Sequence, residues 1–551
     1  MNRFRRAGFE RNAARHGAAR HSSLLAAVLT AGFCLALLVP ELDRPGVTWD
    51  EPEYFQSVER IQAWVSAAVQ DPKGMLEADR IQAAWDPPEH RYHNPHPPVY
   101  KEGMAITEAI AGDSLGRVAG YRLSSAIMFA VLVALLTWTV GRVAGLAAGI
   151  GAGLSIAFMP RVFGHAHVAA TDMPLTLFWA LCVLGFASYL RNGGGVRLAV
   201  AGVALGLAMG TKFTGWLLPA PLLVWAILER RGFAWFAVIG IGLFVAWLLV
   251  PPAWHDPLGA VAELFEESLG RDETIPIFTI YAGRIYEYVA PWHQAIVMTL
   301  ITVPAGIACL AFIGCADAAR GRGILRPVDE RAALARLALL QVGFFLVLMA
   351  LPRSPNHDGV RLFLPMFPFV AILAGLALGR FDAALQARFD SRSALLGILL
   401  AGAVYLGPAW WQMRQASPYY LSYYNELIGG LHGAEAAGME VTYWYDAITP
   451  EFIAEIEGTL PMGSTVLAFP TVKYFVELQQ LGLLRDDLEF SSDLSSDYLL
   501  MIARKATLPP PLLEVYETVQ PILAVELDGV ELAGLYALNE PQPPAEPGTG
   551  E

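Results

Sequence analysis

The sequence predicts an α-helical polytopic membrane protein with about 11 transmembrane helices, interfacial helices in the first outer loop and a small C-terminal α/β domain outside the membrane. Of its 551 residues, 55% are hydrophobic and 16% are charged, whereas about 25% of the residues in a soluble globular protein are charged. Mean hydropathy is +0.43. Long apolar runs follow one another to about residue 411, and a more mixed composition follows them. Together these observations exclude an ordinary soluble domain.

Eleven apolar runs approach the roughly 20 residues that a helix needs to cross a ~30 Å hydrocarbon core. The first run follows a segment with six arginines and one glutamate. No small-x-small cleavage site comes after it, which predicts an uncleaved signal anchor. The shortest run is at 197–210. The runs lie at about 22–40, 119–141, 144–160, 173–190, 197–210, 213–228, 233–250, 294–314, 334–351, 362–379 and 395–411.

The distribution of charge predicts the orientation in the membrane, because lysine and arginine concentrate in cytoplasmic segments. With the N-terminus inside, the inner segments hold 19 arginines and 7 acidic residues, and the outer segments hold 19 basic and 44 acidic residues. This asymmetry predicts a basic cytoplasmic N-terminus at 1–21 and an extracytoplasmic C-terminus. The net charge of −13 therefore belongs to the outer face and argues against nucleic-acid binding.

A membrane module is predicted at 22–411, with outer loops at about 41–118 and 251–293. In the first loop, "YFQSVERIQAWVSAAV" has apolar residues at helical spacing, which is typical of a helix in the interface plane. In the tail at 412–540, "STVLAF" and "YLLMIA" indicate buried strands, and "LAVELDGVELAGLYAL" indicates a hairpin that turns at Asp528-Gly529. A small extracytoplasmic α/β domain is expected there, and residues 541–551 have a disordered composition.

The stretch "TWDEPEYFQ", just after the first apolar run, contains the acidic pair Asp50-Glu51. Locally it predicts a helix start, with Asp50 as N-cap and Glu53 at the capping-box position. A carboxylate about ten residues beyond a transmembrane helix also lies near the membrane surface, where it could take a proton from an acceptor hydroxyl. The two interpretations are compatible, since a capped helix start is a rigid place for a base.

A second candidate segment is "MPRVFGHAHVAATDMPLTLFW", which carries Arg161, His165, His167 and Asp172 between two apolar runs. An Asp-x-Pro helix start is usually a cap. An ionisable residue close to the bilayer is energetically costly, however, and indicates function. Both interpretations of Asp172 remain open from the sequence.

Several cations border the apolar runs on the outer side. Most are expected to be snorkelling anchors, but arginine and lysine can also bind a lipid phosphate. Lys212 in "GTKFTGW" and Arg361 are the favoured phosphate ligands because each lies in a Gly/Pro-rich turn, and Arg161 is a third candidate.

Five motifs, taken together and in order, resemble the glycosyltransferase family 39 type of GT-C membrane enzyme. This group includes the protein O-mannosyltransferases and the bacterial aminoarabinose transferase that modifies lipid A. The resemblance runs over about 22–411 and implies a GT-C fold for that region. The motifs are "TWDEPEY", "HNPHPPVYK", "GHAHVAATDMPLTLFW", "GTKFTGWLLPAPLLVW" and "NHDGVRLFLPMFPF".

The resemblance implies a metal-assisted, inverting transfer of a hexosyl or pentosyl group, at the outer face of the inner or plasma membrane of the cell. The donor would be a sugar on a polyprenyl-phosphate carrier, and the acceptor a hydroxyl of a lipid, glycan or protein. By matching positions, Asp50 would be the general base, Glu51 its partner and Asp172 a second carboxylate in the same cavity. Such a displacement needs a base opposite the leaving phosphate and cations that hold that phosphate.

One motif departs from the aminoarabinose transferase pattern. In that pattern a Glu-Lys pair precedes Pro-Pro in the first loop, with the glutamate on a metal and the lysine on phosphate; here Pro95-His96 stands instead. His93, His96 or His255 in "PAWHDP" would then have to bind the divalent metal ion, or the metal dependence differs. Imidazoles with carboxylates would suit a transition metal, and carboxylates alone would suit magnesium or manganese.

Two other classes of function remain as alternatives. A transporter or flippase for a lipid-linked sugar would concentrate ionisable groups in broken helices near the midplane, often in inverted repeats. Here the ionisable groups cluster in the outer loops and no repeat is visible, which favours the enzyme. A sensor or assembly factor that works through its tail is disfavoured because the tail shows no catalytic constellation.

Overall fold

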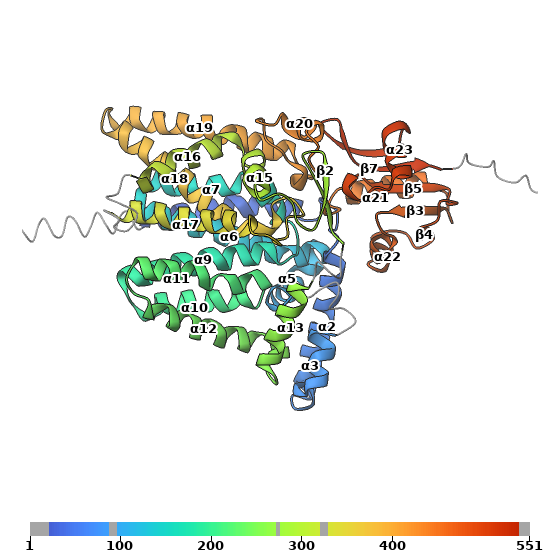
Figure 1. The fold of residues 1–551 in the computed structure, drawn as a ribbon, viewed down its shortest axis with the longest axis horizontal. Helices are drawn as coiled ribbons and strands as arrows, with labels where there is room; N and C mark the ends of the chain where they lie inside the picture. The colour runs from blue at the N-terminus through green and yellow to red at the C-terminus, as the bar shows by residue number, and fades with distance from the viewer. Residues whose placement is uncertain (1–20, 88–95, 271–275, 320–328, 539–551) are drawn as a thin grey trace, which may run out of the picture.

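The computed structural model describes residues 21–87, 96–270, 276–319 and 329–538. Long helices lie side by side in a bundle, and a sheet domain formed by the end of the chain sits beyond one end of it (Figure 1). We call this end of the bundle the C-terminal-domain end. The helices of the bundle are an unlabelled first helix His21–Glu41, α6 Arg117–Ala144, α7 Leu146–Ala157, α9 Asp172–Asn192, α10 Gly195–Met209, α11 Pro219–Leu228, α12 Phe233–Leu249, α15 Gln294–Thr302, α16 Ala305–Ala319, α17 Glu330–Met349, α18 Phe367–Gln386 and α19 Ser391–Gln415.

The predicted multi-pass membrane protein is confirmed by these helices, and the exact number of spans stays a prediction. Within the described residues, six helices are long and apolar enough to cross a membrane. The pair α15 and α16 is bent by 117° at a break that contains Pro304, and proline interrupts the helical hydrogen bonding. Four further apolar helices are shorter. These eleven elements coincide with the eleven apolar runs, and the shorter ones are Leu146–Ala157, Gly195–Met209, Phe213–Leu228 and Phe233–Leu249.

The core of the bundle is built around α18, in which 94% of the most apolar window is buried. Its Gly375 and Gly379 form a G-x-x-x-G pair that lies against α7. A Cβ at Gly375 would come within 2.5 Å of the Ala148 carbonyl oxygen, and one at Gly379 within 2.7 Å of the Ala148 side chain. Small residues at this spacing let two membrane helices approach closely. By contrast, only 17% of the corresponding window of α19 is buried.

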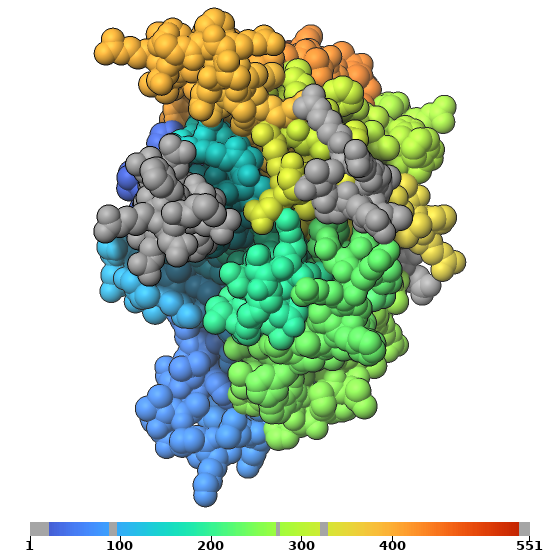
Figure 2. Space-filling model, turned by 90° about the vertical axis from the view of Figure 1, so that its left-hand side faces the viewer, coloured from blue at the N-terminus to red at the C-terminus, as the bar shows by residue number. Residues whose placement is uncertain are grey.

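The first loop forms an arm of helices that projects from the bundle. Figure 2 shows this arm in blue beside the green segment around α12 and α13. Ile61, Ile81 and Trp85 form its small apolar core, against which Trp254 packs. The first-loop elements are α2 Glu51–Gln70, η2 Gly74–Leu76, α3 Ala78–Trp85 and α5 Val99–Leu115, and the neighbouring η4 Pro251–Ala253 and α13 Pro257–Leu269 belong to the second outer loop.

The end of the chain forms a mixed sheet with strand order β4-β3-β5-β7-β6 among the described residues. β3 is parallel to β4 and β5, and β7 is antiparallel to β5 and β6. The two segments predicted as buried strands lie at β3 and β5, and the hairpin turning at Asp528-Gly529 joins β6 to β7. The elements are α21 Pro450–Thr459, β3 Thr465–Phe469, α22 Val472–Gln480, β4 Glu489–Ser491, β5 Tyr498–Ile502, η7 Lys505–Thr507, α23 Pro510–Thr518, β6 Leu523–Leu527 and β7 Val530–Ala537.

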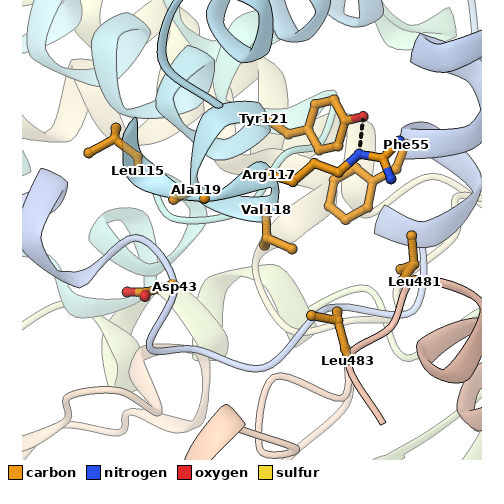
Figure 3. A pocket seen from close by; sticks show the side chains of 10 residues that line it. Asp43, Phe55, Leu115, Arg117, Val118, Ala119, Tyr121, Leu481 and Leu483 are labelled. Atoms are coloured by element: carbon orange, nitrogen blue, oxygen red, sulfur yellow. Dashed lines mark hydrogen bonds between the residues drawn. The ribbon is translucent and has the colours of Figure 1, made fainter. Parts of the chain in front are cut away.

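This sheet domain is docked on the arm and on α6. Leu481 and Leu483, just after α22, face Val118 and Phe55 across a hollow of about 200 Å³ (Figure 3). The Tyr474 hydroxyl donates to the Val47 carbonyl oxygen at 2.5 Å. The remaining connecting elements are η1 Val39–Glu41, α8 Pro160–His165, η3 Phe213–Leu217, β1 Phe278–Tyr281, β2 Arg284–Glu287, η5 Arg361–Met366, η6 Tyr420–Ser422 and α20 Gly430–Ala436.

Candidate active site

Asp50 occupies the N-cap position of α2, but its side chain makes no capping hydrogen bond. Half of a capping box is formed two residues earlier, because the Thr48 hydroxyl also donates to Glu51 and does not accept from its backbone N–H. The backbone N–H of Thr48 donates to Oε2 of Glu51 at 2.7 Å, as a threonine and a glutamate three residues apart do in this motif. The predicted pairing of Asp50 with Glu53 is therefore wrong, and the Asp50 carboxylate is left available for other contacts.

Those other contacts come from two distant segments of the chain. Arg361 donates from Nη2 to Oδ2 of Asp50 at 2.5 Å, and the indole N–H of Trp444 donates to the same oxygen at 3.2 Å. The Arg361 guanidinium also lies 4.1 Å from the Trp444 ring centroid. The Asp50 side chain keeps 13% of its surface exposed, so it is oriented from two sides and still accessible.

Arg361 connects Asp50 to two further carboxylates. Its Nε donates to Oδ2 of Asp172 at 3.0 Å, and its Nη1 donates to Oδ2 of Asp358 at 3.2 Å. The ammonium of Lys212 donates to the other oxygen of Asp172 at 2.7 Å. The structure thus brings together four of the residues singled out in the sequence, Asp50, Asp172, Lys212 and Arg361, at the C-terminal-domain end of the bundle.

The turn before Arg361 requires a glycine. Asp358 and Gly359 have φ values of 54° and 64°, a region that glycine adopts without steric penalty and aspartate tolerates better than most residues. A Cβ at Gly359 would lie 2.5 Å from Nη1 of Arg161 and 2.9 Å from the ring of Tyr443. This turn therefore aims Asp358 and Arg361 at the site and lets Arg161 approach from behind.

Glu51 is fully buried, and both of its carboxylate oxygens accept hydrogen bonds. Arg122 donates to both of its oxygens, at 2.8 Å from Nε and 2.7 Å from Nη2, and the backbone N–H of Ala169 donates to Oε1 at 2.9 Å. Arg122 is buried as well, and it donates to the carbonyl oxygens of Leu42, Pro45 and Gly46. Glu51 therefore joins the start of α2 to the segment that leads into Asp172.

Arg161 lies next to this group without contacting Asp172. Its Nε donates to the Tyr423 carbonyl oxygen at 2.9 Å, and its guanidinium lies 4.5 Å from the Tyr424 ring centroid and 5.8 Å from that of Tyr443. Nη1 and Nη2 are buried and have no hydrogen-bond partner among the described residues. Of the three cations predicted to bind phosphate, Arg161 is thus the one with whole donor atoms that have no partner among the described residues.

His165 and His167 are buried beside the site. Burial lowers the pKa of each imidazole to about 4, so both rings are neutral at pH 7 and add no positive charge. The His165 ring lies 5.4 Å from the Trp444 ring, and the His167 ring is stacked on Tyr420. His165 is therefore part of the wall beside Trp444, and His167 packs against Tyr420.

The structure places His255, one of the three histidines predicted to bind a metal, away from Asp50. His93 lies outside the described residues. The carbonyl oxygen of His96 accepts from the Lys101 ammonium at 3.4 Å. Nε2 of His255 is 2.8 Å from the Leu76 carbonyl oxygen, beyond the far end of α2, whose 20 residues span ~30 Å.

The described residues do not fit a resident metal ion. They contain no group of three His, Cys, Asp or Glu side chains that could hold one. The carboxylates that do converge, Asp50, Asp172 and Asp358, each direct at least one oxygen at a guanidinium or ammonium group. Cationic side chains therefore occupy the positions around these carboxylates.

Trp444 and Asp358 are site residues that sequence reasoning missed. Trp444 belongs to the aromatic segment "VTYWYDAITP", which runs beside the start of α2: Gly46 N–H donates to the Asp446 carbonyl and Trp49 N–H to the Trp444 carbonyl. The concentration of aromatic residues there was the available signal. Asp358 stands within "NHDGVRLF", three residues before Arg361.

Comparison with known proteins agrees with this architecture. The profile of the family described as "Dolichyl-phosphate-mannose-protein mannosyltransferase" matches residues 95–255. ArnT from Cupriavidus metallidurans bound to undecaprenyl phosphate is 13% identical with a TM-score of 0.51, and its apo state is 15% identical with a TM-score of 0.54. Each alignment covers 94% of this chain and 99% of that chain. No curated protein matches significantly.

The arabinofuranosyltransferase AftD from Mycobacteria gives a weaker match, with 15% identity, a TM-score of 0.41 and coverage of 95% of this chain and 42% of that chain. The fold of this chain is similar to that of ArnT. The family profile and this fold confirm the GT-C resemblance that the motifs indicated.

Proposed function

We propose that this chain is a membrane glycosyltransferase that moves a sugar from a polyprenyl-phosphate-linked donor to an acceptor hydroxyl by an inverting displacement. The observation that carries the proposal is the Asp50 carboxylate, accessible and held by Arg361 beside Asp172 and Lys212. The undecaprenyl phosphate bound to ArnT supports a lipid of this class. We place the site on the outer face of the inner or plasma membrane, with the N-terminus inside, because of the charge asymmetry.

In the proposed step the oxygen of the acceptor hydroxyl bonds to the anomeric carbon of the sugar, and Asp50 takes the proton of that hydroxyl. The bond from that carbon to the phosphate oxygen breaks, and the polyprenyl phosphate leaves with the electron pair. The proton then passes from Asp50 to water. Asp50 suits this role because its side chain is partly exposed and is oriented by Arg361 and Trp444.

The leaving phosphate develops negative charge, which preorganised cations stabilise. Lys212 and Arg361 both hold Asp172, so a phosphate oxygen that binds them competes with that carboxylate for their donors. Arg161 has two donors without a partner among the described residues. We therefore propose that Lys212 and Arg361 contact the phosphate by exchanging partners, and that Arg161 contributes donors it already has free.

Glycan analysis and a direct transfer assay test the function. Mass spectrometry of cell-surface glycolipids and glycoproteins, with and without the chain, is expected to show loss of one sugar substituent. Purified chain is then incubated with undecaprenyl-phosphate sugars labelled in the sugar, and with envelope acceptors from cells that lack it. We expect labelled product and free undecaprenyl phosphate. Movement of label into sealed vesicles without a product would instead support the transporter or flippase.

A divalent metal ion, which the resemblance implies, stays a separate proposal. The described residues do not fit one, and no step above runs through it. Since His93 lies outside those residues, chelation is the direct test. Loss of transfer that a single added divalent ion restores would support the metal, and unchanged transfer after chelation would remove it.

A further inference from the structure

Arg504 extends from the sheet domain into contacts that lie outside it. It follows β5, and its guanidinium donates to the carbonyl oxygens of Phe278 and Tyr443 at 3.0 and 3.1 Å. It also donates to Oε1 of Glu440 at 3.3 Å and to Oδ1 of Asp358 at 3.1 Å. Only 12% of its side chain is exposed, so its guanidinium contacts these partners rather than solvent.

Asp358 is shared between two arginines. Its Oδ1 accepts from Arg504, and its Oδ2 accepts from Arg361 and lies 3.1 Å from Nδ1 of His357. Burial alone would favour the neutral acid, but the nearby His357, Arg504 and Arg361 hold the pKa of Asp358 well below its usual range. Asp358 is thus a charged bridge between the sheet domain and the cation that binds Asp50.

We propose that Arg504 is a positioning residue for sugar transfer, which fixes Arg361, and through it the Asp50 carboxylate, by holding Asp358. The inference rests on the proposed function and gives the C-terminal domain a part in it. Arg361 has guanidinium contacts with Asp50, Asp172 and Asp358, so the orientation of any one of these carboxylates affects its hold on the other two.

Charge balance explains why removal of Arg504 would change the orientation of Asp50. Four carboxylates, Asp50, Asp172, Asp358 and Glu440, face Lys212, Arg361 and Arg504 in this network. Without Arg504, Arg361 is the remaining guanidinium on Asp358 among the described residues. Its attraction to Asp358 then grows at the expense of its contact with Asp50, and the base loses its fixed orientation.

The sheet domain has other contacts that keep it docked when Arg504 is changed. Tyr474 bonds to the Val47 carbonyl, and Leu481 and Leu483 face Val118 (Figure 3). Arg485 provides a matched control, since it is a half-buried arginine of the same domain that donates to the carbonyl oxygens of Glu457, Leu460 and Pro461. Its partners all belong to the sheet domain.

The test compares full-length Arg504→Gln, Arg504→Lys and Arg485→Gln in the transfer assay, with the undecaprenyl-phosphate sugar that the native chain uses fastest. Arg504→Gln is expected to lower kcat by about 10- to 100-fold, the effect of a misplaced reacting group, with a smaller change in KM. Arg504→Lys should restore part of the loss. Arg485→Gln should leave kcat within about 3-fold of native, since its hydrogen-bond partners do not reach the site and distant residues without shared partners act independently.

Asp358→Asn completes a double-mutant cycle. Because Arg504 acts through Asp358, adding Arg504→Gln to Asp358→Asn should lower kcat by much less than it does alone. Equal losses in Arg504→Gln and Arg485→Gln, or independent losses in the cycle, would overturn the positioning role. If Arg504→Gln does not fold, Arg504→Lys and Asp358→Asn still decide the question.

Failure of this inference is distinguishable from failure of the proposed function. If Asp50→Asn is inactive while Arg504→Gln is fully active, the inference alone falls. If the native chain transfers no sugar, or Asp50→Asn retains full transfer, the proposed function falls and the positioning role falls with it.

Discussion

Asp50→Asn is expected to lower sugar transfer by about 10²- to 10⁴-fold, the usual contribution of a general base, while undecaprenyl phosphate still binds. Asparagine has the shape of aspartate, and its amide oxygen can still accept from Arg361 and Trp444, which now share Oδ2 of Asp50. It cannot take a proton from an acceptor hydroxyl. The measurement is kcat in the transfer assay together with equilibrium binding of labelled undecaprenyl phosphate.

Asp71→Asn serves as the control for this variant. Asp71 is an exposed aspartate at the other end of α2, where its carboxylate accepts a hydrogen bond from the Gly74 N–H. We expect the Asp71→Asn substitution to leave transfer unchanged. If Asp50→Asn and Asp71→Asn both retained native kcat, Asp50 would not be the base. If Asp50→Asn instead abolished binding of undecaprenyl phosphate, its role would be in donor binding.

The residues of the site that could be found from the sequence are those at or near the ends of apolar runs. Asp172, Lys212 and Arg361 each border such a run and Asp50 lies about ten residues beyond one; charged groups close to a membrane are costly and therefore indicate function. Their partners could not be found in this way. Trp444 is 394 residues from Asp50 along the chain, and no local pattern indicates so distant a contact.

The capping box shows a different limit of local reasoning. Thr48-x-x-Glu51 and Asp50-x-x-Glu53 are two overlapping matches to the same motif, and the amino-acid sequence is compatible with both. Arg122 decides between them, because its buried guanidinium needs a buried carboxylate and Glu51 supplies it. The choice of frame therefore depends on a residue 71 positions away, and it leaves the Asp50 carboxylate outside the cap.

Distance along a helix explains why His255 is not at the site. "PAWHDP" and "TWDEPEY" both fall in predicted outer loops, so the sequence allowed them to meet. The structure has α2 lying between them as a continuous helix of 20 residues, with His255 beside the segment that follows its end.

The apolar runs indicated where helices lie but did not reveal the break at Pro304 that bends α15 against α16.

Arg122→Met is expected to reduce the free energy of unfolding by about 3–5 kcal/mol, because it leaves Glu51 as an uncompensated buried charge. It also removes the donor for the carbonyl oxygens of Leu42, Pro45 and Gly46. Thermal unfolding of the purified chain in detergent measures the change. Arg117→Met on the same helix is the control, since Arg117 and its partner Glu59 are exposed and such a pair contributes about 1 kcal/mol or less.

Equal stability of Arg122→Met and Arg117→Met would contradict a structural role for the buried pair. Adding Glu51→Gln to Arg122→Met should recover part of the stability, because the buried charge is then removed. Glu51 also binds the backbone of Thr48 and Ala169, which lead into Asp50 and Asp172. Loss of Glu51 should therefore lower stability and transfer together, whereas Asp50→Asn should lower transfer alone, and this difference separates the residue that positions the site from the residue that reacts.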